Sequence, residues 1–262
     1  MTGPVIQSLP SAAKDAARLA ARLGATMHEV AVHRFPDGEL RVTVGAAATT
    51  TILYAPFDRP NENLVAALFA ADALRRRGAQ RLVLVAPYLC YMRQDTAFHE
   101  GEAISQKVVG RLIAGAVDRV ITVDAHLHRT KSIADVFPGI EADNLSAMPA
   151  IADFLRATGF DPGTIVVGPD AESEPWVRDL AGRLKADWAV ARKTRHSDRS
   201  VEMTFAFLSA FVNDLPDLFK QSSYIKWLLD KPLRPRRLQL LRHPSILSPT
   251  CHEDSNFRVH SQ

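Results

Sequence analysis

Three short polar clusters stand where apolar runs end, and their side chains are of the kinds that bind nucleotides and divalent metal ions. They are Arg93-Gln94-Asp95, Asp124-Ala125-His126-Leu127-His128 and Asp170-Ala171-Glu172. A guanidinium and an amide can donate to a phosphate or a base, and carboxylates beside water or phosphate oxygens suit Mg²⁺, which usually takes one or two protein ligands. Solvated loops and structural hydrogen-bonded pairs use the same residue types. The types alone therefore leave both interpretations open.

A fourth cluster, Arg192–Arg199, is strongly basic. It carries four Lys or Arg residues within eight positions and no large apolar side chain. Such a segment is either a solvated surface turn or a mobile clamp. A clamp of this kind would stabilise the charge that develops on a transferring phosphoryl group and would exclude water. We expect a loop here in either case.

Familiar phosphate and metal motifs are missing from the sequence. There is no G-x-x-x-x-G-K-[ST] loop and no G-x-G-x-x-G fingerprint. The Asp-Ala-His-x-His stretch lacks the four-ligand spacing of a zinc site, and the cysteines Cys90 and Cys251 make neither a metal cluster nor a disulfide framework. If the protein binds phosphates, it does so through a different structural motif.

Composition indicates an ordinary globular protein. The chain has 262 residues, of which 47% are hydrophobic and 23% charged, and its net charge of +3 comes from residues 204–262, which hold eight Lys or Arg against five acids. Because the body is neutral, we expect no nucleic-acid partner. No secretory leader and no apolar run of about 20 residues is visible, so we expect a cytoplasmic protein without a membrane partner.

The elements that must position the clusters alternate along the chain. Strands are predicted at 28–33, 40–44, 50–55, 81–86, 119–123, 164–167 and 188–191, and helices at 11–23, 61–77, 103–114, 147–158 and 174–186. Ser11 and Asn61 are the expected N-caps, and Gly24 and Gly78 the expected helix stops. This alternation predicts βαβ units and a parallel sheet, whose strands end at one shared edge where ligands bind.

Two further features concern organisation. The sequence Phe35-Pro36-Asp37-Gly38-Glu39 lies between two predicted strands and predicts a hairpin, because Pro fixes φ and Gly accepts a positive φ. One βα series gives way to a second around residues 142–148. We therefore expect an N-terminal α/β domain over 1–145, part of a second α/β domain over 146–203, and an atypical tail over 204–262.

The order of these motifs resembles that of the ribose-phosphate pyrophosphokinase (phosphoribosyl diphosphate synthetase) family over roughly residues 5–203. Pro87–Asp95 is similar to the family's ATP-binding loop. Phe35–Glu39 is similar to the family's hairpin, which reaches the adenine of the ATP bound to a neighbouring subunit. Asp124-Ala125-His126, Gly168-Pro169-Asp170 and Lys193-x-Arg195 resemble its Mg·ATP, second metal and catalytic-loop segments. The sequence of the segment Gly168–Ser173 is closer to that of the family's archaeal-type branch than to that of its allosteric bacterial and mammalian branch.

The resemblance implies an α/β fold with two phosphoribosyltransferase-like (Rossmann-like) parallel-sheet domains, the second of them incomplete. It implies transfer of diphosphate from ATP to the 1-hydroxyl of ribose 5-phosphate for nucleotide biosynthesis, with Mg²⁺ as cofactor and a homodimer or higher oligomer. The residues carried over are Phe35, Asp37, Glu39, Arg93, Gln94 and Asp95 for ATP, His126 and Asp170 for magnesium, Lys193 and Arg195 for catalysis, and Arg195 for ribose 5-phosphate.

The sequence departs from the family after Met203. The family's ribose-5-phosphate loop is a strand ending in two acids, followed by a Ser/Thr/Gly-rich turn, and nothing after Met203 fits it. The last glycine is Gly182, so eighty residues follow without one, although a phosphate cradle of closely approaching backbone normally needs glycine. Residues 204–229 are apolar and compatible with one or two helices, and 231–262 are typical of disorder.

Several explanations stay open at this stage. The reading frame was lost near Met203, or the tail is a divergent C-terminal extension. In either case the chain could be a catalytically inactive, nucleotide-binding member of the family, such as a regulatory or truncated subunit. A purine or pyrimidine phosphoribosyltransferase is a further alternative, but it would need the same missing loop.

Overall fold

The computed structural model describes residues 3–161, 163–197 and 200–205, and of residues 192–197 and 200–205 it describes only the backbone. The chain divides into two compact units, unit 1 over Met1–Ala147 and unit 2 over Met148–Gln262. This division falls close to the boundary expected at 145/146.

Unit 1 is built on a sheet of six parallel strands. In space they run in the order β2-β1-β5-β6-β7-β8. Their bounds are β1 Val5–Ser8, β2 Thr26–Glu29, β5 Thr50–Tyr54, β6 Arg81–Ala86, β7 Arg119–Val123 and β8 Glu141–Leu145. The α/β fold with a parallel sheet is therefore confirmed, and the predicted strands at 50–55, 81–86 and 119–123 are all present.

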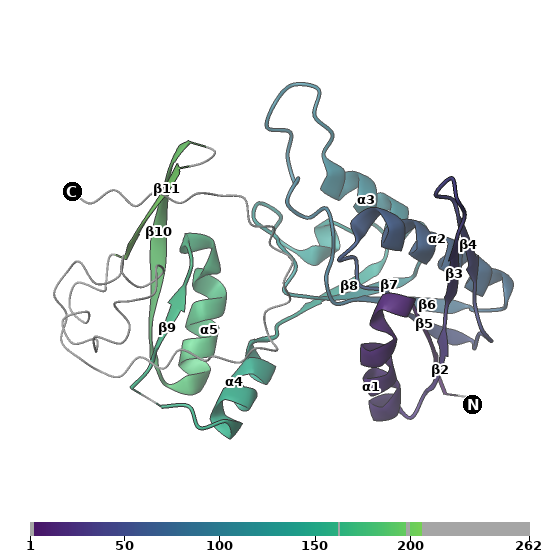
Figure 1. Ribbon diagram of the computed structural model, residues 1–262, viewed down its shortest axis with the longest axis horizontal. Helices are drawn as coiled ribbons and strands as arrows, with labels where there is room; N and C mark the ends of the chain where they lie inside the picture. The colour runs from purple at the N-terminus through teal and green to yellow at the C-terminus, as the bar shows by residue number, and fades with distance from the viewer. Residues whose placement is uncertain (1–2, 162, 198–199, 206–262) are drawn as a thin grey trace. The chain divides into compact units, whose positions relative to one another are not determined.

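Helices cover both faces of this sheet (Figure 1). They are α1 Ala13–Leu23, α2 Pro60–Arg76 and α3 Ser105–Ala114, together with the 3₁₀ turns η1 Pro10–Ala12 and η2 Ile133–Asp135. Apolar side chains of α2 and α3 pack with Leu53, Leu82 and Leu84 in the main core. On the opposite face α1 packs in a smaller cluster around Ile6. Burial of these aliphatic groups is the main source of stability in the unit.

The helix boundaries agree with the prediction except at the caps. Gly24 ends α1 in the left-handed conformation, at φ 59°. Ser11, however, lies inside η1, and α1 begins without a side-chain cap. Asn61 is likewise inside α2, because Pro60 occupies the first turn. Proline suits that position, since the first N–H groups of a helix have no intrahelical partner.

The predicted hairpin is present as β3 Ala31–Arg34 and β4 Leu40–Thr43, paired antiparallel. Gly38 lies at φ 95° in its turn. The single strand expected over 28–33 is wrong, because the chain leaves the parallel sheet at Val30. This residue is fully buried and its N–H donates to the Ser8 carbonyl at 2.8 Å, after which β3 starts the separate two-stranded sheet.

Unit 2 contains a βαβ segment followed by a hairpin. Its elements are α4 Met148–Ala157, β9 Ile165–Gly168, η3 Ala171–Ser173, α5 Glu174–Leu184, β10 Asp187–Ser197 and β11 Ser200–Phe205. The three strands form a sheet in the order β11-β10-β9, in which β9 and β10 are parallel and β10 and β11 antiparallel.

The basic segment differs from the expectation. A short strand over 188–191 followed by a loop was expected, but β10 continues through residues 192–197 and pairs with β11. Antiparallel pairing satisfies the backbone N–H and C=O groups that a loop would leave to water, which favours the longer strand. β11 extends to Phe205, and the expectations for residues 206–262 lie outside the described residues.

Among the described residues, no helix combines the length and the apolar character that crossing a bilayer requires.

Candidate nucleotide site at the carboxyl edge of the sheet

The loops that follow β5, β6 and β7 meet at one edge of unit 1, because these strands are parallel neighbours. The longest loop connects β6 to α3 and extends away from the sheet (Figure 1). It contains Arg93-Gln94-Asp95, and the loop after β7 contains His126. The two clusters therefore share an edge, as the strand-end argument expects.

The first part of the β6–α3 loop is packed against the core. Leu89, Cys90 and Met92 are all buried, and the Tyr88 carbonyl accepts from the Phe57 N–H at 3.1 Å. Burial raises the pKa of the Cys90 thiol to about 11, so this cysteine is an inert core residue. This part of the loop is anchored to the apolar core.

Tyr91 turns the chain. It lies at φ 61°, a left-handed conformation that side chains rarely adopt, and its hydroxyl donates to Asn61 Oδ1 at the start of α2. A strained backbone persists only where the surroundings hold it. Here the buried neighbours on both sides and the contact with α2 hold the turn that presents Arg93.

Helix α3 supports the same loop through Gln106, which is 3% exposed. The Gln106 N–H donates to the Gln94 carbonyl at 3.1 Å, and its Nε2 donates to the Met92 carbonyl at 3.4 Å. Its Oε1 accepts from the hydroxyl of Thr130, in the loop after β7, at 2.9 Å. One buried amide thus joins the two loops.

Asp95 forms a second link between these loops. Its side chain is 1% exposed, and its two oxygens accept from the N–H and the guanidinium of Arg129, each at 3.0 Å. Burial alone would raise the pKa of the Asp95 carboxyl, but the hydrogen bonds and the charge of Arg129 outweigh it and the pKa is lowered. The Arg129 guanidinium also lies 5.2 Å from the ring centre of Phe98. In this structure Asp95 therefore acts as a structural link.

Arg93 and Gln94 lie between these supports. Arg93 is exposed, and among the side chains that the structure describes its guanidinium has neither a hydrogen-bond nor an ion-pair partner. Gln94 Nε2 donates to Glu102 Oε2 at 3.1 Å, and the same oxygen accepts from the Phe98 N–H at 2.8 Å. A fixed backbone with an unused guanidinium can receive an anionic ligand.

His126 is exposed after β7 and stacks on His128, with 6.2 Å between ring centres. Asp124, two residues earlier, lies at φ 43°, and its Oδ2 accepts from the Ala147 N–H at 2.9 Å. Within the described part of the chain no three His, Cys, Asp or Glu side chains gather as a metal site. Mg²⁺ usually takes only one or two protein ligands and keeps water or phosphate oxygens for the rest, so a magnesium site does not require such a group.

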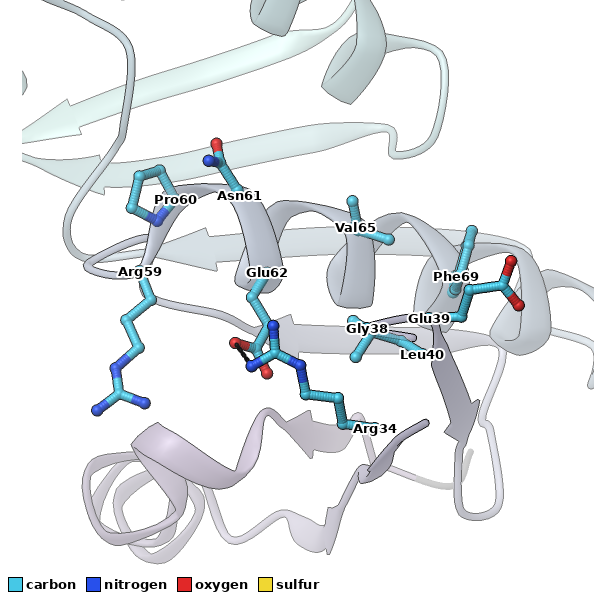
Figure 2. Close-up of a pocket in the computed structure, with 10 residues that line it drawn as sticks. All are labelled: Arg34, Gly38, Glu39, Leu40, Arg59, Pro60, Asn61, Glu62, Val65 and Phe69. Atoms are coloured by element: carbon cyan, nitrogen blue, oxygen red, sulfur yellow. Dashed lines mark ion pairs between the residues drawn. The ribbon is translucent and has the colours of Figure 1, made fainter. Parts of the chain in front are cut away.

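The hairpin carries the other predicted ATP residues and borders an open groove of about 730 Å³ beside α2 (Figure 2). Arg34 and Glu62 form an ion pair at 3.6 Å across it, and its lining includes Glu39, Val65 and Phe69. Arg59 and Asn61 extend in opposite directions from the start of the helix. Glu39 is thus placed beside α2, whose Asn61 contacts the β6–α3 loop through Tyr91.

The tip of the hairpin is ordered by short-range contacts. Asp37 Oδ1 accepts from the Glu39 N–H at 3.1 Å. The Phe35 ring is 37% exposed, with the His33 ring edge-on at 4.8 Å and the Arg41 guanidinium 6.0 Å from its centre. An exposed aromatic ring in such a setting can stack on another flat group.

In unit 2 the predicted residues lie in the turn between β9 and η3 and on β10. Asp170 caps η3, because its Oδ1 accepts from the Ser173 N–H at 3.1 Å; among the described residues its Oδ2 accepts no hydrogen bond. A Cβ on Gly168 would lie 2.2 Å from Ser173 Oγ, so this turn requires glycine. The backbone places Lys193 and Arg195 in β10, opposite Met203 and Val201.

Sequence reasoning missed the residues that support the loop, namely Asn61 as a partner of Tyr91, Glu102, Gln106 and Arg129. A polar Gln106 on the apolar face of a predicted helix was the one available signal. The others depend on contacts between separate loops, which spacing along the chain does not encode.

Comparisons with known proteins agree with this geometry. Residues 5–116 match the model of the N-terminal domain of ribose phosphate pyrophosphokinase. Ribose-phosphate pyrophosphokinases of Methanopyrus kandleri and Methanobrevibacter smithii are 33% identical over 188 residues and 35% identical over 196 residues. These alignments cover 71% and 73% of this chain, but 63% and 64% of the relatives. The chain therefore spans less than two thirds of their length.

A solved structure shows the same fold. The phosphoribosylpyrophosphate synthetase of Mycobacterium smegmatis superposes with a TM-score of 0.63 at 25% identity, covering 77% of this chain and 67% of that one. Family model, relatives and fold all point the same way. The chain thus carries the N-terminal domain of the ribose-phosphate pyrophosphokinase family.

Proposed function

We propose that the protein transfers the β,γ-diphosphate of ATP to the 1-hydroxyl of ribose 5-phosphate, giving 5-phosphoribosyl 1-diphosphate and AMP. The observation that carries this proposal is the exposed Arg93, which is unpaired among the side chains that the structure describes. It lies at the carboxyl edge of the sheet, on a loop held by three neighbouring elements, in a chain whose relatives are named ribose-phosphate pyrophosphokinases.

In this reaction the O1 oxygen of ribose 5-phosphate forms a bond to the β-phosphorus. The bond between that phosphorus and the oxygen bridging to the α-phosphate breaks, the electron pair leaves with AMP, and the hydroxyl proton passes to solvent. The protein contributes position and charge rather than a covalent intermediate. Arg93 would bind the ATP phosphates, and Gln94 would contact the nucleotide after giving up its bond to Glu102.

Mg²⁺ is the proposed cofactor. When bound, it would neutralise phosphate charge and orient the diphosphate for transfer. His126 would contact it through water, because Mg²⁺ prefers oxygen ligands, and the unused oxygen of Asp170 would do so directly or through water. Lys193 and Arg195 would stabilise the charge of the transferring group, and Arg195 would also bind the sugar phosphate.

We also propose a homodimer or higher oligomer as the working unit. The hairpin residues Phe35, Asp37 and Glu39 would contact the adenine of ATP held by a neighbouring subunit. The exposed ring of Phe35 supports this assignment, because an aromatic face and a purine stack well.

Nucleotide binding is the first test of the proposal. Calorimetric titration of Mg·ATP into the full chain should give saturable binding. Arg93→Met should weaken it by about 10-fold to 100-fold, the value of a lost charged hydrogen bond. Arg22→Met, an exposed arginine in the last turn of α1, is the matched control and should bind like the parent.

The same titrations also discriminate between functions. Equal affinities in all three proteins would contradict the assigned site. Tight binding without ribose 5-phosphate-dependent AMP release would instead favour a nucleotide-binding subunit without activity.

A further inference from the structure

Gln106 is an unusual residue for its position. It stands in the first turn of α3, is 3% exposed, and is a side chain with two donors and one acceptor. Burying an amide is unfavourable unless its polar atoms are hydrogen-bonded. Here the oxygen and the nitrogen both have partners, and these partners belong to two different loops.

The start of α3 depends on the same residue. Its N-cap, Ile104, offers no side-chain hydrogen bond. The first N–H groups of a helix need partners outside it, and the Gln106 N–H finds one in the Gln94 carbonyl at 3.1 Å. The β6–α3 loop thus caps the helix that in turn holds the loop.

These contacts bracket Arg93. Gln106 binds the carbonyls of Met92 and Gln94, the residues on either side of it. The Gln106 side chain also holds Thr130, which follows Arg129 directly in the chain. Because Arg129 in turn binds Asp95, two ties fix the loop that carries Arg93 against the loop that carries His126.

We propose that Gln106 is a positioning residue that sets the spacing between the β6–α3 loop and the loop after β7. It presents the Arg93 guanidinium at a fixed place relative to His126 without touching a ligand itself. This inference rests on the proposed function in one respect, namely that Arg93 and His126 bind the phosphates and metal of Mg·ATP.

The test uses a set of variants of the full chain. Gln106→Met keeps the side-chain volume and removes the two side-chain hydrogen bonds but not the backbone one to Gln94, and Thr130→Val removes the tie to Gln106 from the other loop. Lys107→Met, an exposed residue beside Gln106 on α3, is the matched control. The double variant of Gln106 and Thr130 completes a cycle that reports whether the two residues act together.

Two readouts are taken on each protein. Amide hydrogen exchange of peptides spanning 92–96 and 129–131 reports the tie itself and needs no ligand. Calorimetry reports the affinity for Mg·ATP. We expect Gln106→Met to speed exchange in both peptides by about 10-fold and to weaken ATP binding by a similar factor, as expected for two lost hydrogen bonds. Lys107→Met should change neither readout, and the double variant should resemble the single ones.

The outcomes separate this inference from the proposed function. Unchanged hydrogen exchange in both peptides would overturn the inference about Gln106, and so would additive effects of the Gln106 and Thr130 substitutions. Faster exchange with unaltered affinity in a parent that binds ATP would overturn the positioning role. If the parent fails to bind ATP, the proposed function falls, while faster exchange in both peptides still supports the tie between the loops.

Discussion

Two helical glycines should respond in opposite ways to the same substitution. Gly110 lies in α3, where a Cβ would meet the Val136 carbonyl oxygen at 2.1 Å and the Val136 Cγ1 at 3.1 Å. Gly182 lies in α5, where a Cβ would meet nothing within 4 Å. Alanine is about 1 kcal/mol more favourable than glycine inside a helix. Gly182→Ala should therefore stabilise its unit by about 0.5–1 kcal/mol.

At Gly110 the clash outweighs the helix preference. Because the obstacle is backbone, α3 or the segment at Val136 must move by about 1 Å to reach a normal contact, and overpacking of this kind costs about 1–3 kcal/mol. Gly110→Ala should thus lower the free energy of unfolding by up to about 2 kcal/mol net of the propensity gain. It should also displace the helix that carries Gln106.

Unfolding in urea, followed by far-UV circular dichroism and by hydrogen exchange of peptides from each unit, measures both effects. Exchange is needed because the unit that is affected must be identified. A stabilising Gly110→Ala would refute the close approach of α3 to Val136. A destabilising Gly182→Ala would show that this part of α5 is covered.

Three other substitutions or conditions test the site. The pKa of Asp95 is lowered, so its contribution to stability is present above its ordinary pKa of 3.8 and is lost as pH falls through the lowered value. The free energy of urea unfolding should therefore fall more between pH 7 and pH 3.5 in the parent than in Arg129→Leu. Cys90, with a pKa raised from 9.0 to about 11, should react with a thiol reagent at pH 8 about 100-fold more slowly than in urea, measured in a Cys251→Ser background, and rapid native labelling would contradict its burial. Lys193→Ala should lower turnover far more than ATP affinity if it acts on the transferring group, and equal losses in both would contradict that role.

The strands that could be predicted are those with a strong apolar pattern. β6 and β7 were placed correctly because each is a short run of aliphatic residues buried between helices. β1 was missed because it ends in Gln7 and Ser8, both fully buried although polar. Two hydrogen bonds to a segment far along the chain offset the burial of Gln7. Its Oε1 accepts from the Gly45 N–H at 3.0 Å, and its Nε2 donates to the Ala46 carbonyl at 2.8 Å.

The edge strand β8 was missed for a different reason. Its sequence, Glu-Ala-Asp-Asn-Leu, is polar, and among the strands that the structure describes it pairs only with β7. Arg119 on β7 supports it through ion pairs with Asp143 at 2.7 Å and Glu141 at 3.3 Å. A strand held by charge pairs across a sheet edge carries no apolar signal that a sequence pattern could reveal.

The candidate site likewise has residues that the sequence could predict and residues that it could not. The position of Arg93 and Gln94 followed from one rule, that ligands bind where parallel strands end. Their support by Gln106 and by the Asp95–Arg129 pair did not follow, because it depends on the packing of two loops that are separate in sequence. In the same way, nothing local in the basic segment indicated that β11 would convert it into a strand.

Phosphorus NMR of this chain with ATP, Mg²⁺ and ribose 5-phosphate is the decisive test of the proposed diphosphate transfer. Transfer of an intact diphosphate converts ATP to AMP and produces the two signals of a diphosphate ester, in equal amounts and only when ribose 5-phosphate is present. We expect that result with the parent chain, and its loss in Lys193→Ala. ATP that stays unchanged, or that yields ADP in place of AMP, would contradict it.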